Sequence, residues 1–394
     1  MASTDDVSTR ECPACRAMVP AAVFCGRCGA DREAAATAWH VLLRPGVFAA
    51  APREALPVPR ITSSLFPRLA APARRPFRLA LALLLVAMVV LSVLRANMPL
   101  GVVATLGGPV VFVLYMWQTN AFRDIGVRAL MIAALIGAGT SVAWWFYAGR
   151  LVASSYGVTT AAGQSLLNVF AVVGLAATLG GAVLMLLPAV VVRLLRVPVD
   201  CLDGFVIGAF GALAYAVAGT ATWMMPQIVA GLLDPRSSWQ LFEDAITYGV
   251  IDPVTTVALG GLVGLSLWFR PNTAAPQHRF ARTALTVCTV SAAVLYAGVW
   301  TVDALAPPEI IEVMVKLVLA TLALLTARFG LQIALLHGTP APATGQPVLC
   351  VHCEKVVPDK AFCPACGAAA RASAPGVRAQ PRLIPVSGAD HRAN

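Results

Sequence analysis

Eight cysteines form two clusters of the same design, one in each end region of the chain. In both clusters, two C-x2-C pairs are separated by nine residues. The cysteines are Cys12, Cys15, Cys25 and Cys28 in the first cluster and Cys350, Cys353, Cys363 and Cys366 in the second. A C-x2-C pair aims two thiolates at one point, and two pairs complete the tetrahedral sulfur shell that Zn²⁺ prefers. The spacing therefore predicts two structural zinc ions, and not redox-active thiols or disulfides.

The residues around the cysteines repeat as well, which indicates one small domain used twice. A phenylalanine, Phe24 or Phe362, directly precedes the second pair in each copy, and a Gly-Ala step follows it. A unit of this size cannot bury a core, so metal ligation must supply most of its folding free energy. A shell of four cysteines has no open coordination position, which argues against catalytic zinc. Because that shell is already full, we expect His352, inside the second cluster, to be exposed to solvent.

The stretch between the clusters must position them, and it is too apolar for a soluble domain. Of the 394 residues of the chain, 58% are hydrophobic and 12% are charged, a composition typical of membrane proteins. Apolar windows near or above the ~20 residues that cross ~30 Å of hydrocarbon cover residues 77–94, 100–117, 129–147, 165–192, 205–225, 245–269, 284–305 and 310–336. The predicted fold class is an all-α polytopic membrane protein with about eight transmembrane helices, flanked by two small four-cysteine zinc ribbons.

The arginines predict the orientation in the plasma membrane. With the amino terminus in the cytoplasm, the cytoplasmic side holds Arg74, Arg75, Arg78, Arg123, Arg128, Arg193, Arg196, Arg270, Arg279 and Arg282. The other side then holds only Arg95, Arg150 and Arg236. This split follows the positive-inside rule. An even number of crossings returns the second ribbon to the cytoplasm, a reducing compartment that suits metal-bound cysteines.

The regions outside the membrane divide into ribbons, linker and tail. The predicted domains are a zinc ribbon at 1–36, a basic Pro-rich linker at 37–76, a transmembrane domain at 77–337, a second ribbon at 346–371 and a disordered tail at 372–394. Between residues 44 and 78 the only acidic residue is Glu54, among seven arginines. This stretch is either a solvated tether that also sets the topology, or a contact for anionic lipid headgroups of the bilayer.

The zinc ribbons themselves allow two roles. Each is either a structural cap that holds a terminus near the membrane, or a rigid surface that binds a protein partner at little cost in ordering. Acidic and basic side chains are mixed in both ribbons. A phosphate-binding patch needs clustered basic residues, so nucleic acid is not favoured as a partner.

Few ionisable residues lie within the apolar windows, and each is costly there. Glu312 and Lys316 stand four residues apart on one helix, so we expect them to form a salt bridge. We expect Arg328 to extend its side chain toward the cytoplasmic surface. Asp252 has no partner nearby in the sequence and precedes Pro253, which frees backbone groups. Asp252 is therefore either a packing or capping group or an intramembrane site.

Three segments carry a resemblance to a known family. The stretch 203–216, DGFVIGAFGALAYA, resembles the D-G-x-x-x-G-x-x-x-G-x-x-F-A segment of PrsW-type intramembrane proteases. The stretch 252–260, DPVTTVALG, is similar to the H-P-x-F-T-A-x-x-G helix of that family, and 297–300, AGVW, to its H-x-x-W helix. The resemblance covers about residues 180 to 305 and implies a protease-like helical core.

The same alignment lacks the family's catalytic groups. The Glu-Glu pair falls on 188–193, PAVVVR, the Glu that closes the D-G helix falls on Gly219, and the two histidines fall on Asp252 and Ala297. Peptide hydrolysis needs a base or metal and a charge that stabilises the oxyanion, and Asp252 alone cannot supply both. We assign no catalytic residue, and the resemblance implies a degenerate, non-catalytic binding or regulatory member of actinobacterial type. An active intramembrane peptidase and a small-molecule or lipid transporter are the alternatives.

Overall fold

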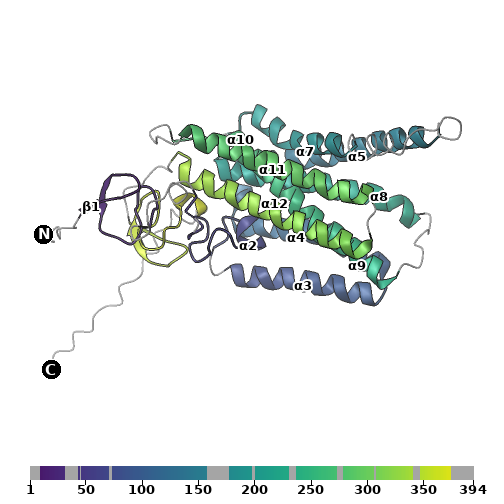
Figure 1. Ribbon diagram of the computed structural model, residues 1–394, viewed down its shortest axis with the longest axis horizontal. Coiled ribbons are helices and arrows are strands. Elements are labelled where there is room, and N and C mark those ends of the chain that lie inside the picture. Colours follow the sequence, from purple (N-terminus) through teal and green to yellow (C-terminus); the bar gives the residue numbers. More distant parts are fainter. Residues whose placement is uncertain are drawn as a thin grey trace, which may run out of the picture.

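The protein is an elongated bundle of helices with two small ribbons at one end (Figure 1). The computed structural model describes residues 9–31, 43–44, 46–70, 73–157, 177–197, 200–229, 237–272, 278–305, 308–339 and 347–373. The predicted disordered tail at 372–394 lies outside these residues from residue 374 onward, as does the first part of the fourth apolar window.

Long helices make up the bundle. They are α3 (Arg74–Val93), α4 (Asn97–Gln118), α5 (Val127–Gly157), α7 (Ala177–Leu194), α8 (Cys201–Val229), α10 (Asp252–Trp268), α11 (His278–Leu305) and α12 (Glu309–His337). Shorter elements are α2 (Ile61–Ser64), α9 (Ser238–Ile246), the 3-10 turn η4 (Ala370–Ala372) and the π-helical turns η1 (Phe122–Gly126) and η3 (Thr247–Ile251). Each ribbon begins with an antiparallel hairpin, β1 (Thr9–Glu11) with β2 (Met18–Pro20) and β3 (Pro347–Leu349) with β4 (Val356–Pro358).

Within the described residues, seven helical spans are long and apolar enough to cross a membrane. They are Arg74–Val93, Asn97–Gln118, Phe122–Ala148, Cys201–Thr222, Ser238–Trp268, Arg279–Val302 and Glu309–His337. The stretch Leu179–Leu194 of α7 is apolar but shorter. The outer surface suits a lipid environment, since α3 exposes Leu79, Leu83, Val86 and Val90 at helical spacing. A multi-pass membrane protein is therefore confirmed, in the form of seven long spans and one shorter apolar helix.

The bundle is built around α8, which crosses α10 at close range. A Cβ added to Gly208 would collide with the backbone carbonyl of Gly260, and one added to Gly264 would collide with that of Gly204. Small residues spaced four apart allow this approach, and van der Waals contact between the helix backbones then stabilises the pair. On its other side, α8 packs on α5, where a Cβ on Gly137 would meet the backbone of Gly211.

The segment before α3 is part of the folded core. Phe48, Leu56 and Leu69 are fully buried or nearly so, and Arg68 forms a buried ion pair with Asp203 at the start of α8. The prediction of a solvated tether is therefore wrong for residues 46–70. Its basis was the density of arginine and proline, but the apolar residues between them pack on the end of the bundle, and buried acids pair with two of the arginines.

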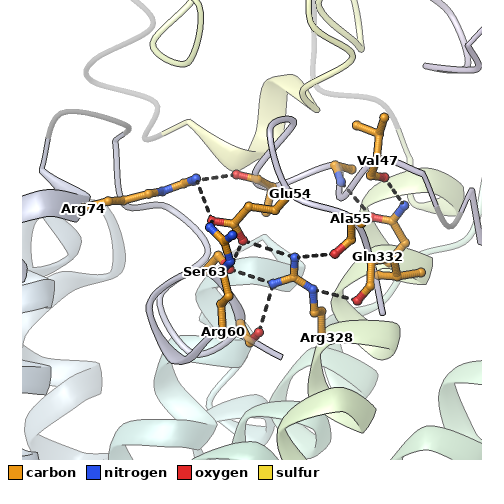
Figure 2. A network of polar contacts seen from close by, with 12 residues as sticks. Val47, Glu54, Ala55, Arg60, Ser63, Arg74, Arg328 and Gln332 are labelled. Atoms are coloured by element: carbon orange, nitrogen blue, oxygen red, sulfur yellow. Dashed lines mark hydrogen bonds and ion pairs between the residues drawn. The ribbon is translucent and has the colours of Figure 1, made fainter. Parts of the chain in front are cut away.

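Glu54 is the centre of the polar contacts at this end of the bundle (Figure 2). It accepts a hydrogen bond from Ser63 at 2.5 Å and forms ion pairs with Arg328 at 3.2 Å and Arg60 at 3.3 Å. Arg328 is fully buried, so it does not extend to the surface as predicted. Instead its guanidinium lies 4.0 Å from the centroid of the Phe48 ring and donates to the carbonyl oxygen of Leu56 at 2.9 Å. The arginine is thus neutralised inside the protein.

A second buried side chain of α12 holds the same segment. Gln332 accepts a hydrogen bond from the Ala49 amide at 2.8 Å and donates to the carbonyl oxygens of Leu43 and Val47 at 2.8 and 3.0 Å (Figure 2). Its side chain is fully buried. Leu43, Val47 and Ala49 are therefore held against the end of α12 through their backbone groups.

Candidate metal centres

The eight predicted ligands form two compact four-sulfur sets. Within each set, all four sulfur atoms lie within 4.8 Å of one another. The Sγ atoms of Cys12 and Cys28 are 3.8 Å apart, as are those of Cys15 and Cys25, and the equivalent pairs of the second set have the same separation. A tetrahedron with Zn–S bonds of about 2.3 Å has S···S edges of about 3.8 Å. The donor sets therefore fit a tetrahedral metal ion.

Tight backbone turns position the sulfur atoms. The Arg16 amide donates to the Cys12 carbonyl at 2.8 Å, and the Gly29 amide donates to the Cys25 carbonyl at 2.6 Å. Both donors have positive φ, 53° and 74°, in the left-handed region. The second ribbon repeats these turns, with Gly367 at φ 76° in place of Gly29. The turn thus favours the glycine that follows each second pair, because glycine adopts positive φ without strain.

The sulfur atoms of each set also share protons. A hydrogen bond from the Cys28 thiol lowers the pKa of Cys25 to about 4, and the same bond raises the pKa of Cys28. In the second set, hydrogen bonding with Cys363 lowers the pKa of Cys350, and the bond to Cys350 raises the pKa of Cys366. Four adjacent thiolates repel one another, so a divalent cation would replace the shared protons and release them on binding.

His352 is buried, in contrast to the prediction of solvent exposure. Its side chain is 5% exposed, and burial lowers its pKa to about 4, with nearby Arg74 acting in the same direction. Both ring nitrogens are without a hydrogen-bond partner among the described residues. The metal-binding set consists of the four cysteines without it. Sequence spacing could not reveal this burial, because it results from packing of the folded ribbon near the start of α3.

The predicted salt bridge inside the membrane region is confirmed. Lys316 Nζ lies 2.5 Å from Glu312 Oε1, and the lysine is buried. The pair occupies the first turns of α12, at the end of the bundle away from the ribbons (Figure 1).

Asp252 is buried in the middle of the bundle. It directly follows the π-helical turn η3, where Pro253 removes an amide donor and the helix widens. Thr256 Oγ1 donates to Asp252 Oδ1 at 3.2 Å, and the carboxylate interacts electrostatically with Tyr215 of α8 and Tyr296 of α11. The structure therefore places Asp252 within electrostatic range of one tyrosine on each of two other helices.

The role of Glu54 and the pairing of Arg68 with Asp203 were not predicted from the sequence. The one available signal was the position of Glu54 as the only acid in a strongly basic segment. Its principal partner, Arg328, is 274 residues away, so no local pattern connects them.

Comparisons with family models, with curated proteins and with solved structures find no match to this chain.

Proposed function

We propose that this chain is an eight-span plasma-membrane protein that acts by binding, and that its two zinc ribbons form a cytoplasmic cap with a structural zinc ion in each. The observation that carries the proposal is the pair of closed four-sulfur sets with tetrahedral spacing. Zinc suits an all-sulfur tetrahedral shell, and such a shell holds a fold together without offering a position for water or substrate.

The contact between the two ribbons supports eight crossings. The Phe24 amide donates to the Pro364 carbonyl at 3.1 Å, so both ribbons lie on one side of the membrane. This requires an even number of crossings, whereas seven would place them on opposite sides. Helix α7 has 18 residues, about 27 Å at 1.5 Å per residue, and runs beside α5 (Figure 1). It supplies the eighth crossing in this proposal.

The charge distribution supports a cytoplasmic location for the cap. Arg74 at the start of α3, Arg193 near the end of α7 and Arg328 all make contacts at the ribbon end of the bundle. The positive-inside rule assigns this end to the cytoplasm. Exposed arginines near this end would contact anionic headgroups in the proposal, namely Arg53, Arg60, Arg75 and Arg78.

A binding role is supported by the exposed face of the cap. Met18 of β2 and Val356 of β4 occupy equivalent positions in the two hairpins and are 65% and 63% exposed. Each ribbon of the cap thus exposes an apolar side chain at the same position of its hairpin. We favour a protein partner for this surface, on a helical core that would be an inactive relative of PrsW-type proteases.

Transport is the second candidate, and Asp252 is the observation that favours it. A buried carboxylate that directly follows a π-helical turn, in the middle of a membrane helix, is an arrangement found at ion or substrate pathways. An active peptidase has less support, because the residues aligned with the catalytic groups include no carboxylate or histidine besides Asp252.

One comparison of variants separates binding from transport. We expect the double variant Met18→Ser/Val356→Ser to lose a protein that co-purifies with the wild-type chain after crosslinking in native membranes, and Asp252→Asn to retain it. The measurement is quantitative mass spectrometry of the purified complexes, with Leu79→Ser on the lipid-facing side of α3 as the control. Retention of every partner by the double variant would contradict the binding role of the ribbons. Loss of partners in Asp252→Asn alone would favour the intramembrane site.

A further inference from the structure

The two ribbons contact each other through equivalent parts. The Phe24 amide donates to the Pro364 carbonyl, and the Phe362 amide donates to the Gly26 carbonyl, both at 3.1 Å. Phe24 and Phe362 each precede the second C-x2-C pair, and Gly26 and Pro364 each follow the first cysteine of that pair. In each ribbon, the amide of the phenylalanine therefore donates to the same position of the other ribbon. This reciprocity is the arrangement of a two-fold interface between identical subunits, here made within one chain.

The side chains at this interface follow the same symmetry. A Cβ added to Gly29 would collide with the Phe362 ring, and one added to Gly367 would lie 2.8 Å from the Phe24 ring. Each ring therefore packs on the glycine turn that closes the opposite metal site. These glycines meet two requirements at once, the positive φ of the turn and the space for the phenylalanine of the other ribbon.

The groups that make the contact belong to the metal-binding turns. Gly26 lies between two ligands of the first site, Cys25 and Cys28, and Pro364 lies between two ligands of the second. Metal binding fixes the backbone of such a turn, which is disordered without it in units of this size. Metal at one site therefore shapes the surface on which the other ribbon docks. Linked equilibria act reciprocally. Docking of the two ribbons must therefore raise the metal affinity of each site by the same factor by which metal at that site favours docking.

From this geometry, which rests on the zinc assignment proposed above, we infer that the two four-cysteine sites bind zinc cooperatively as one two-metal unit. The second ribbon of the chain is the partner for which the inner face of the first is built. The unit is tied to the bundle by backbone and side-chain contacts, since the Ala369 amide donates to the Ala49 carbonyl at 2.9 Å and Arg371 donates to Thr339 Oγ1 at 3.0 Å. Loss of zinc from either site thus loosens the cap as a whole.

The test uses the full chain in lipid nanodiscs and measures zinc released by increasing concentrations of a chelator. We expect the wild type to release both ions in one steep transition. The Cys25→Ser/Cys28→Ser variant, which keeps only the second site, should release its ion at a chelator concentration about five- to a hundredfold lower, the usual range for coupled sites. Phe24→Ala retains all eight cysteines but loses the ring at the interface. It should therefore release both ions at a lower chelator concentration than the wild type.

Controls separate coupling from misfolding and from failure of the zinc assignment. Arg10→Ala changes an exposed residue of the same ribbon and should behave as the wild type. Each variant must remain monodisperse with unchanged helical circular dichroism. If the wild type holds two zinc ions but the second site keeps wild-type affinity in the Cys25→Ser/Cys28→Ser variant, coupling is overturned while the zinc ribbons stand. Coupling would also be overturned if Phe24→Ala lowered the chelator concentration that releases zinc at one site but not at the other.

Discussion

Replacing Glu54 by glutamine is expected to lower the free energy of unfolding by about 3–5 kcal/mol, the usual cost of removing one partner of a buried ion pair. The substitution keeps the size of the side chain but leaves the fully buried guanidinium of Arg328 without its counter-charge. It also weakens the hydrogen bond from Ser63. The measurement is an unfolding titration of the purified protein with a denaturing detergent.

Two further variants make this result specific. Arg60→Ala removes an ion pair whose arginine side chain is 47% exposed, so its effect should stay below about 1 kcal/mol. Glu54→Gln/Arg328→Met removes both buried charges and should recover part of the stability lost by Glu54→Gln alone, since a well-packed apolar replacement of a buried pair is often neutral. Equal effects of Glu54→Gln and Arg60→Ala would show that Glu54 does not hold Arg328.

The pH dependence of stability provides an independent check on Glu54. Burial alone would raise its pKa, but hydrogen bonds from Ser63 and Arg328 together hold the pKa below its ordinary value of 4.5. A lowered pKa in the folded state means that the stabilisation is complete above pH 4.5 and is lost as the pH falls through the folded-state pKa. The Glu54→Gln variant should lack this component of acid destabilisation.

Substituting Gly208 by valine is expected to prevent assembly of the central helix pair. The added side chain would collide with the backbone of Gly260, which cannot move aside as a flexible side chain could, so α8 and α10 would separate. We expect a loss of at least about 3 kcal/mol, the upper part of the range for overpacked cores. The measurement is the yield of monodisperse protein together with its thermal unfolding temperature.

Helix α5 offers a matched pair of controls for the same experiment. Gly137→Val should also disrupt packing, because its Cβ would collide with the Gly211 carbonyl. Gly139 is two residues further along the same helix and has open space around it, so Gly139→Val should be tolerated. If Gly208→Val and Gly139→Val gave the same yield and unfolding temperature, the close crossing of α8 and α10 would be wrong.

The parts of the fold that were predictable from the sequence depend on short-range patterns. The four ligands of each site lie within one short stretch, so C-x2-C spacing was sufficient to find them. Glu312 and Lys316 are one helical turn apart, and their pairing followed from that spacing alone. Hydropathy likewise located the long spans. A membrane helix satisfies its backbone hydrogen bonds within one continuous segment, so each span is visible as one apolar run.

The parts that were not predictable depend on contacts between distant segments. Arg328 was expected to extend its side chain to the cytoplasmic surface, whereas it stays buried and pairs with Glu54 in the segment before α3. His352 was expected to be exposed because four cysteines already fill the metal shell, whereas packing in the folded chain buries it. The contact between ribbons uses backbone groups and two glycines, and its visible trace in the sequence was the repeat of the phenylalanine and of the glycine.

The zinc content of the full chain is the most direct test of the account. Zinc and protein should be quantified in one purified sample, together with X-ray absorption at the zinc edge. We expect two zinc ions per chain, each with four sulfur neighbours at about 2.3 Å and no nitrogen or oxygen neighbour. Fewer than one zinc ion per chain, or cysteines recovered as disulfides, would contradict it.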